Sequence, residues 1–71
     1  MIDQDYLQNK IDDLMDFIYT NGLELDFQQF SPYHFRIKNK IDVWPSTQKV
    51  YVKGMSGSKT YESAKEIINY L

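Results

Sequence analysis

This chain has no cysteine, one histidine, two prolines and three glycines among its 71 residues. Without cysteine it forms neither a disulfide framework nor a thiolate metal site, and one histidine leaves a zinc or iron centre few nitrogen ligands. No apolar run approaches the roughly 18 residues that cross a membrane. The N-terminus, MIDQDYLQNK, is acidic and polar, whereas a signal peptide begins basic and continues apolar. We therefore expect a soluble, cytoplasmic protein with no metal, no cofactor and no membrane partner.

The small net charge of −2 conceals an asymmetry between the two halves of the chain. Residues 1–30 hold seven acidic side chains and one basic one, and residues 31–71 hold seven basic and three acidic side chains. The two halves could attract each other within the fold, or their opposite fields could steer partners to the surface. A chain of this length predicts one domain, spanning residues 1–71, with a small core.

Three short antiparallel strands are predicted within residues 33–53, YHFRIKNKIDVWPSTQKVYVK, because apolar and polar residues alternate there. Turns are expected at 38–40, where Asn39 tolerates positive φ, and at 44–47, where Pro45 suits a type I turn. One face of this meander is apolar: Phe35, Ile37, Ile41, Val43, Val50 and Val52. The other face should look outward: His34, Arg36, Lys38, Asp42, Trp44, Lys49, Tyr51 and Lys53.

Helices are predicted on both sides of the meander. Apolar residues at helical spacing indicate a helix over residues 3–20 that ends at Asn21-Gly22, followed by a strand over 24–29. A small polar connector, 54–58, precedes a final helix that Ser58 or Thr60 could cap. Its apolar positions are Tyr61, Ala64, Ile67, Ile68 and Leu71. We expect an α+β two-layer sandwich: a helix, an antiparallel meander of three to four strands, and a helix.

No stretch carries an active site, so we expect no catalytic residue and no enzyme. His34 has no serine or thiol partner at a diagnostic spacing. The segment Gly54 to Thr60, GMSGSKT, departs from the phosphate-binding loop pattern, because Lys59 follows Gly54 by five positions where the pattern requires six. An ordinary connector with a helix cap is the preferred interpretation.

Two surfaces are candidates for binding a partner. Aromatic and basic side chains interleave on the outward sheet face, as nucleic-acid stacking sites and protein hot spots both require. The residues are Arg36, Lys38, Trp44, Lys49, Tyr51 and Lys53. Carboxylates on the first helix could instead occupy a basic groove of a partner: Asp5, Asp12, Asp13 and Asp16. The alternatives are that the aromatics only shield the sheet and that the acidic residues only provide solubility.

Residues 34–54, HFRIKNKIDVWPSTQKVYVKG, resemble a hairpin that recurs in small uncharacterised proteins of bacteriophages and prophages. The matching positions are Phe35, Arg36, Ile41, Asp42, Trp44, Pro45, Ser46, Thr47 and Lys49, and Gln48 stands where the pattern usually has glycine. The resemblance covers under a third of the chain and implies a phage or mobile-element origin. Small acidic proteins from such sources often block host defence complexes, as anti-CRISPR proteins do.

A second likeness, of topology alone, is to double-stranded RNA-binding domains, whose last helix opens with a lysine cluster. The corresponding segment is SKTYESAK, in which Lys59 stands without a second lysine beside it. Our first hypothesis is a non-enzymatic binding protein that blocks or modulates a host protein complex in the bacterial cytoplasm. The alternative is a nucleic-acid-binding module that uses the basic, aromatic sheet face. The identity of the partner and the oligomeric state stay open.

Overall fold

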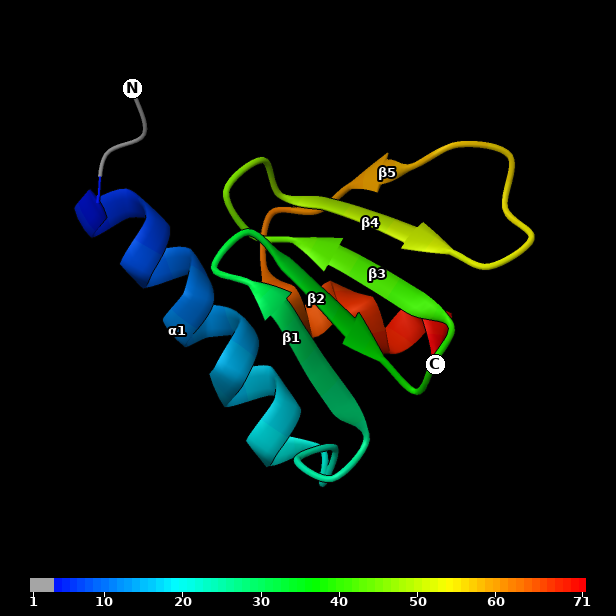
Figure 1. The fold of residues 1–71 in the computed structure, drawn as a ribbon, viewed down its shortest axis with the longest axis horizontal. Helices are drawn as coiled ribbons and strands as arrows, with labels where there is room; N and C mark the ends of the chain where they lie inside the picture. Colours follow the sequence, from blue (N-terminus) through cyan, green and yellow to red (C-terminus); the bar gives the residue numbers. More distant parts are fainter. Residues whose placement is uncertain (1–3) are drawn as a thin grey trace.

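The computed structural model describes residues 4–71, which form one antiparallel sheet and two helices (Figure 1). The strands follow one another as a meander, in the spatial order β1-β2-β3-β4-β5. The elements are α1 (Gln4–Thr20), β1 (Phe27–Ser31), β2 (His34–Ile37), β3 (Ile41–Trp44), β4 (Lys49–Val52), β5 (Lys59–Thr60) and a 3₁₀ helix, η1 (Ala64–Tyr70). The predicted α+β class is confirmed. Asp3, predicted to begin the first helix, lies outside the described residues.

Helix α1 ends where the sequence indicates. Gly22 adopts the left-handed conformation, with φ of 67°, and the backbone N–H of Leu23 donates to the carbonyl of Ile18 at 2.8 Å. The backbone N–H of Gly22 donates to the carbonyl of Tyr19 at 3.2 Å, which completes a Schellman motif. Leu23 is buried, so the chain folds back onto the last turn of α1 before the sheet begins.

The hairpin turns also form as expected. Lys38 and Asn39 both have positive φ, 54° and 57°, which is the geometry of a type I′ turn. In the turn between β3 and β4, the N–H of Thr47 donates to the carbonyl of Trp44 at 3.3 Å, and Gln48 follows with φ of 54°. Glycine adopts such a φ most easily, but the Gln48 side chain donates to the carbonyls of Tyr61 and Glu62, both at 3.1 Å. Gln48 therefore ties this turn to the segment that follows β5.

The first strand lies further along the chain than predicted. The alternation of Leu23, Leu25 and Phe27 predicted a strand over 24–29, whereas β1 begins at Phe27 and includes Phe30 and Ser31. Leu23 belongs to the helix terminus, and Leu25 is 94% exposed in the connecting loop. A register shift between Gln29 and Ser31 marks a bulge that lets β1 extend through Phe30.

The C-terminal region also differs from the prediction. Lys59 and Thr60 pair with β4 as a fifth strand, so they do not begin a helix.

The helix starts at Ala64, where the Glu66 carboxylate accepts the backbone N–H groups of Glu62 and Ser63 at 2.9 and 2.8 Å. A 3₁₀ helix repeats every three residues, so Ala64, Ile67 and Tyr70 turn inward. Ile68, predicted to be apolar core, is 53% exposed.

Both helices pack against one face of the sheet, which we call the inner face. Figure 1 shows η1, in orange and red, behind β2 and β3. The core joins α1, the sheet and η1 through buried side chains: Leu14, Phe17, Ile18, Leu23, Phe35, Ile37, Ile41, Val43, Val50, Tyr61, Ala64 and Ile67. Val52, the sixth residue of the predicted apolar face, is half-buried. Within residues 4–71, neither helix crosses the opposite, outer face of the sheet (Figure 1).

Candidate functional site

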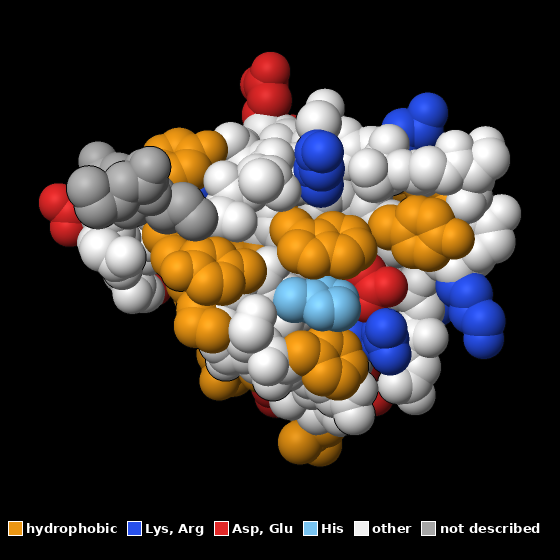
Figure 2. All heavy atoms as spheres, turned by 45° about the horizontal axis from the view of Figure 1, so that its top comes forward, with side chains coloured by type: hydrophobic (Ala, Val, Ile, Leu, Met, Phe, Trp, Pro, Cys, Tyr) orange, Lys and Arg blue, Asp and Glu red, His pale blue; other side chains and the backbone are white. Residues whose placement is uncertain are grey.

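The outer face of the sheet carries the residues that alternate with the buried ones. Arg36 on β2 faces Asp42 on β3, and Asp42 in turn faces Tyr51 on β4. Two residues further along β3, next to the turn, Trp44 faces Lys49. Figure 2 shows apolar side chains clustered around the only histidine of the chain, with acidic and basic side chains beside it. The outward orientation predicted for these strands is therefore confirmed.

Three aromatic rings form a row across β1, β2 and β3. The rings of His34 and Trp44 are stacked, with centroids 4.9 Å apart and planes inclined by 8°. On the other side of His34, the ring of Phe30 lies 5.0 Å away with a tilt of 40°. Phe30 is 52% exposed, because the bulge in β1 turns its side chain to the outer face. The row presents a partly exposed aromatic surface that is fixed by its neighbours.

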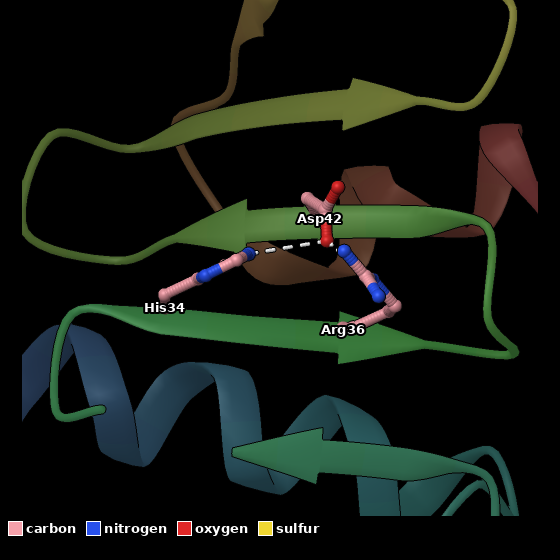
Figure 3. A network of polar contacts seen from close by, with 3 residues as sticks. All are labelled: His34, Arg36 and Asp42. Atoms are coloured by element: carbon pink, nitrogen blue, oxygen red, sulfur yellow. Dashed lines mark hydrogen bonds and ion pairs between the residues drawn. The ribbon is translucent and has the colours of Figure 1, made fainter. Parts of the chain in front are cut away.

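The orientation of this row is held by Asp42 (Figure 3). Its Oδ1 accepts hydrogen bonds from Nε2 of His34 at 3.1 Å and from Nε of Arg36 at 2.8 Å. Because a carboxylate only accepts, Nε2 of His34 must carry a proton in this contact. Burial raises the pKa of Asp42, but the hydrogen bonds and charges of Arg36 and His34 outweigh it, so the pKa lies below its ordinary value of 3.8. Asp42 is therefore ionised at neutral pH.

Arg36 links the polar and aromatic parts of the face. Its guanidinium carbon lies 4.9 Å from the centre of the Phe30 ring, a cation–π arrangement, while its Nε binds Asp42. The guanidinium has five N–H donors, and apart from Asp42 no hydrogen-bond acceptor for them lies among the described residues. Arg36 can thus be fixed by the fold and still donate to an external anion.

Two open hollows meet at Tyr51. The first, about 420 Å³, we call the Trp44 hollow; it is lined by Trp44, Thr47, Lys49, Tyr51 and Ser58. The second, about 260 Å³, we call the Arg36 hollow; it is lined by Arg36, Asn39, Lys40, Asp42, Tyr51 and Lys53. The first is an aromatic hollow with one cation and three hydroxyl groups. The second combines three cations with one carboxylate, so its net charge is positive.

The predicted basic residues are only partly brought together. Lys49 reaches the Trp44 hollow, whereas Arg36 and Lys53 meet in the Arg36 hollow. Lys38 lies in the type I′ turn and lines a different hollow, beside Asp26 and Phe27. Trp44 and Tyr51 both line the Trp44 hollow, and Lys38 lines neither of the two hollows.

The predicted acidic residues of α1 fall into two groups. Asp5, Asp12 and Asp16 are exposed, and their spacing puts them on the side of α1 that faces away from the core. Asp12 accepts a hydrogen bond from the Gln8 amide at 2.8 Å. Asp13 is half-buried, and its Oδ2 accepts the backbone N–H of Ala64 at 2.8 Å, where η1 begins. Asp13 therefore joins the two helices.

Sequence reasoning missed Phe30 and the polar contacts of His34. Phe30 lies just beyond the strand expected over residues 24–29, and no pattern placed its side chain on the outer face. The contacts around Asp42 did have a signal in the sequence: a turn centred on Lys38 and Asn39 places Arg36 opposite Asp42. Opposite charges at facing positions stabilise a pair of strands, so this ion pair could have been predicted.

No three His, Asp or Glu side chains of residues 4–71 gather into a set that could hold a metal ion. In the same part of the chain, no helix is both long and apolar enough to cross a membrane. Comparison with models of protein families, with curated proteins and with solved structures gave no significant match. The assignment of a function therefore rests on the outer face of the sheet and on the acidic side of α1.

Proposed function

We propose that this protein is a non-enzymatic binding module that receives single-stranded nucleic acid on the outer face of its sheet. The observation that carries the proposal is the row of Phe30, His34 and Trp44, which neither helix covers and which cationic side chains border. Stacking of a base on an aromatic side chain contributes about 1 to 3 kcal/mol and tolerates any sequence. The face thus has the chemistry for bases and for phosphates.

The distribution of charge favours a polyanion at this face. Residues 27–60, which contain the sheet, hold six basic side chains and one acidic side chain, Asp42. Asp42 is already paired with Arg36 and His34, so it opposes an incoming phosphate less than a free carboxylate would. The side chains of Lys49 and Lys53 have no hydrogen bond or ion pair within the described residues. They can therefore approach phosphates without breaking an existing interaction.

A single strand suits this surface better than a duplex. Base pairing and stacking hide the faces of the bases in a duplex, whereas a single strand can place them on aromatic side chains. The exposed aromatic surface would remain unused against duplex DNA. We therefore expect tighter binding of a single strand than of the corresponding duplex at the same salt concentration.

The test is fluorescence anisotropy with a labelled 20-nucleotide single strand, at low and at physiological salt. Wild-type protein should bind at low salt and weaken steeply as salt rises, because neutralised phosphates release counterions. Trp44→Ala should weaken binding about tenfold, which corresponds to one lost stacking contact. The matched control is Tyr19→Ala, which removes an exposed aromatic ring from α1 and should leave binding unchanged. No detectable binding at low salt would exclude this function.

A second candidate rests on the exposed carboxylates of α1. Asp5, Asp12 and Asp16 share the side of the helix that faces away from the core, and like charges at this spacing destabilise a helix by a few tenths of a kcal/mol. Such a row fits a host protein groove that otherwise binds phosphates. Together with the likeness to phage hairpins, this favours a mobile-element protein that inhibits a host complex, of the anti-CRISPR kind, in the bacterial cytoplasm.

This candidate is tested by Asp12→Lys combined with Asp16→Lys. The variant should fold, melt at a slightly higher temperature because a lysine at position 16 attracts Asp13 and complements the negative C-terminal end of α1, and lose capture of host proteins from a bacterial lysate treated with nuclease. The matched control is Lys49→Gln with Lys53→Gln, which changes the same number of residues on the opposite surface. Unchanged capture by the folded Asp12/Asp16 variant would remove α1 from the mechanism.

A further inference from the structure

The two hollows on the outer face differ in chemistry and share one residue, Tyr51. The Trp44 hollow lies at the end of the β3–β4 pair that leads into the turn with Thr47, and the Arg36 hollow lies at the other end, beside Asn39. A ligand lying along these strands would meet an aromatic surface first and a cationic one next. This order matches the chemistry of a nucleotide, which has a flat ring at one end and a phosphate at the other.

The part of the Trp44 indole that lines the Trp44 hollow would favour a flat ring, such as a base, in that hollow. His34 on β2 stacks against one face of the indole, and Lys49 pairs with Trp44 from β4, the neighbouring strand on the opposite side. Trp44 lines the hollow and His34 does not, so the hollow meets a part of the indole that His34 leaves uncovered. A base placed there would continue the row of Phe30, His34 and Trp44 by one more ring, at the spacing that aromatic stacks prefer.

The cationic hollow has donors already aimed by the fold. Arg36 is held by Asp42 through Nε at 2.8 Å, which leaves the two terminal nitrogens of its guanidinium to donate. Lys53 adds a second charge from the other side of the hollow, and Lys40 a third; Nζ of Lys40 lies 3.5 Å from the carbonyl oxygen of Leu71. Three cations around one carboxylate favour a phosphate over a neutral group.

We infer that the two hollows form one nucleotide subsite, with a base of a single strand in the Trp44 hollow and an adjoining phosphate in the Arg36 hollow. This inference rests on the proposed function and assigns positions within it. It orients this nucleotide along β3 and β4, from its base to its phosphate. Lys38, on the far side of the type I′ turn, then contacts no phosphate. The occupant is a single strand and not a free nucleotide, because the aromatic row continues from Trp44 across β2 and β1. His34 and Phe30 thus add aromatic surface that one nucleotide does not cover.

The base position is tested by filling the Trp44 hollow. Ser58→Phe places a ring in the hollow from an exposed loop position and should weaken binding of a ten-nucleotide deoxythymidine strand at least tenfold. The matched control is Ser56→Phe, an exposed serine two residues earlier that does not line the hollow, and it should bind like the wild type. Emission from Trp44, the only tryptophan, should be quenched by this strand and not by an abasic strand of equal length.

The phosphate position is tested by a pair of lysines that each follow a strand. Lys53→Gln should flatten the dependence of log K on log salt by about 0.7, the loss of one phosphate contact on a single strand. Lys38→Gln removes the same charge outside the Arg36 hollow and should leave the slope unchanged.

The outcomes separate the subsite from the function. If the wild type binds the strand but Ser58→Phe or Lys53→Gln behaves like its control, the nucleotide subsite is wrong and single-strand binding stands. If the wild type does not bind the strand at low salt, both fall. If thymidine monophosphate displaced the strand at an equal nucleotide concentration, the occupant of the subsite would be a free nucleotide and the assignment of a single strand would be wrong.

Discussion

The two faces of this sheet are made by the same strands and by alternating residues, yet they are built differently. On the inner face, Phe35, Ile37 and Val43 are fully buried and need only fit the space beneath the helices. On the outer face, His34, Arg36 and Asp42 are half-buried and each is fixed by a named partner. The inner face contributes stability through buried apolar area. The outer face consists of polar and aromatic groups with defined positions, which is what recognition of a ligand requires.

The largest expected effect is the difference in stability between two single variants, each of which removes one aromatic ring from one face. Phe35→Ala should lower the free energy of unfolding by about 3 to 5 kcal/mol, because the side chain is fully buried beneath α1 and η1. Trp44→Ala should cost about 1 kcal/mol, mainly the loss of its stack on His34. Urea denaturation of the two variants measures both values. Equal losses would mean that Trp44 belongs to the core and that the outer face is not a free surface.

A smaller effect is expected from Asp42→Asn, which removes the charge that holds the outer face. At pH 7 the variant should be less stable by about 1 to 2 kcal/mol, since Arg36 is itself partly exposed. Folding lowers the pKa of Asp42 below 3.8, so the carboxylate stabilises the protein above that pH and loses this contribution as the pH falls through the folded-state value. The stability difference between wild type and variant should therefore be constant at neutral pH and shrink below about pH 4.

Asp16→Asn is the control for this experiment. Asp16 is exposed on α1, and it has no ion pair among the described residues, so its replacement should change stability at pH 7 by less than about 0.5 kcal/mol. A difference for Asp42→Asn that persisted unchanged in acid would contradict the role of its charge.

A small effect of the opposite sign is expected for a polar atom on the inner side. The hydroxyl of Tyr61 is buried in the core and has no hydrogen-bond partner within the described part of the chain. Burial, with the nearby charges of Asp13 and Tyr6, raises the pKa of this hydroxyl well above its ordinary value, so it stays protonated. Tyr61→Phe should raise the free energy of unfolding by about 0.5 to 1 kcal/mol, as thermal unfolding would measure. A loss of stability would reveal a hydrogen bond that this geometry does not contain.

Much of the fold could be predicted because local patterns and tertiary packing agree. Three patterns each had one physical interpretation: the apolar spacing of α1, Gly22 at its end, and the alternation in β2 to β4. The errors arose where a local pattern was compatible with two different structures. Leu23 and Leu25 alternate like a strand, but Leu23 completes a helix terminus. Ile68 has the spacing of an α-helix, but a 3₁₀ helix with a period of three turns it outward.

The candidate site could be predicted in its orientation and less so in its contacts. Alternation alone put Trp44 and Tyr51 on the outer face. The stack of His34 between Phe30 and Trp44 depends on the bulge in β1, which no residue pattern announced. The position of Lys38 depends on a turn in which that residue itself takes positive φ, so its side chain leaves the face to which alternation assigned it.

The claim that the outer face binds a single strand is tested most directly by NMR on ¹⁵N-labelled protein. Because Trp44 is the only tryptophan, its indole N–H gives a single, unambiguous signal. Addition of a ten-nucleotide deoxythymidine strand should shift this signal and the amides of β3 and β4, while the amides around Asp12 and Asp16 stay in place. Shifts confined to α1, or an indole signal that does not move at saturation, would contradict the account.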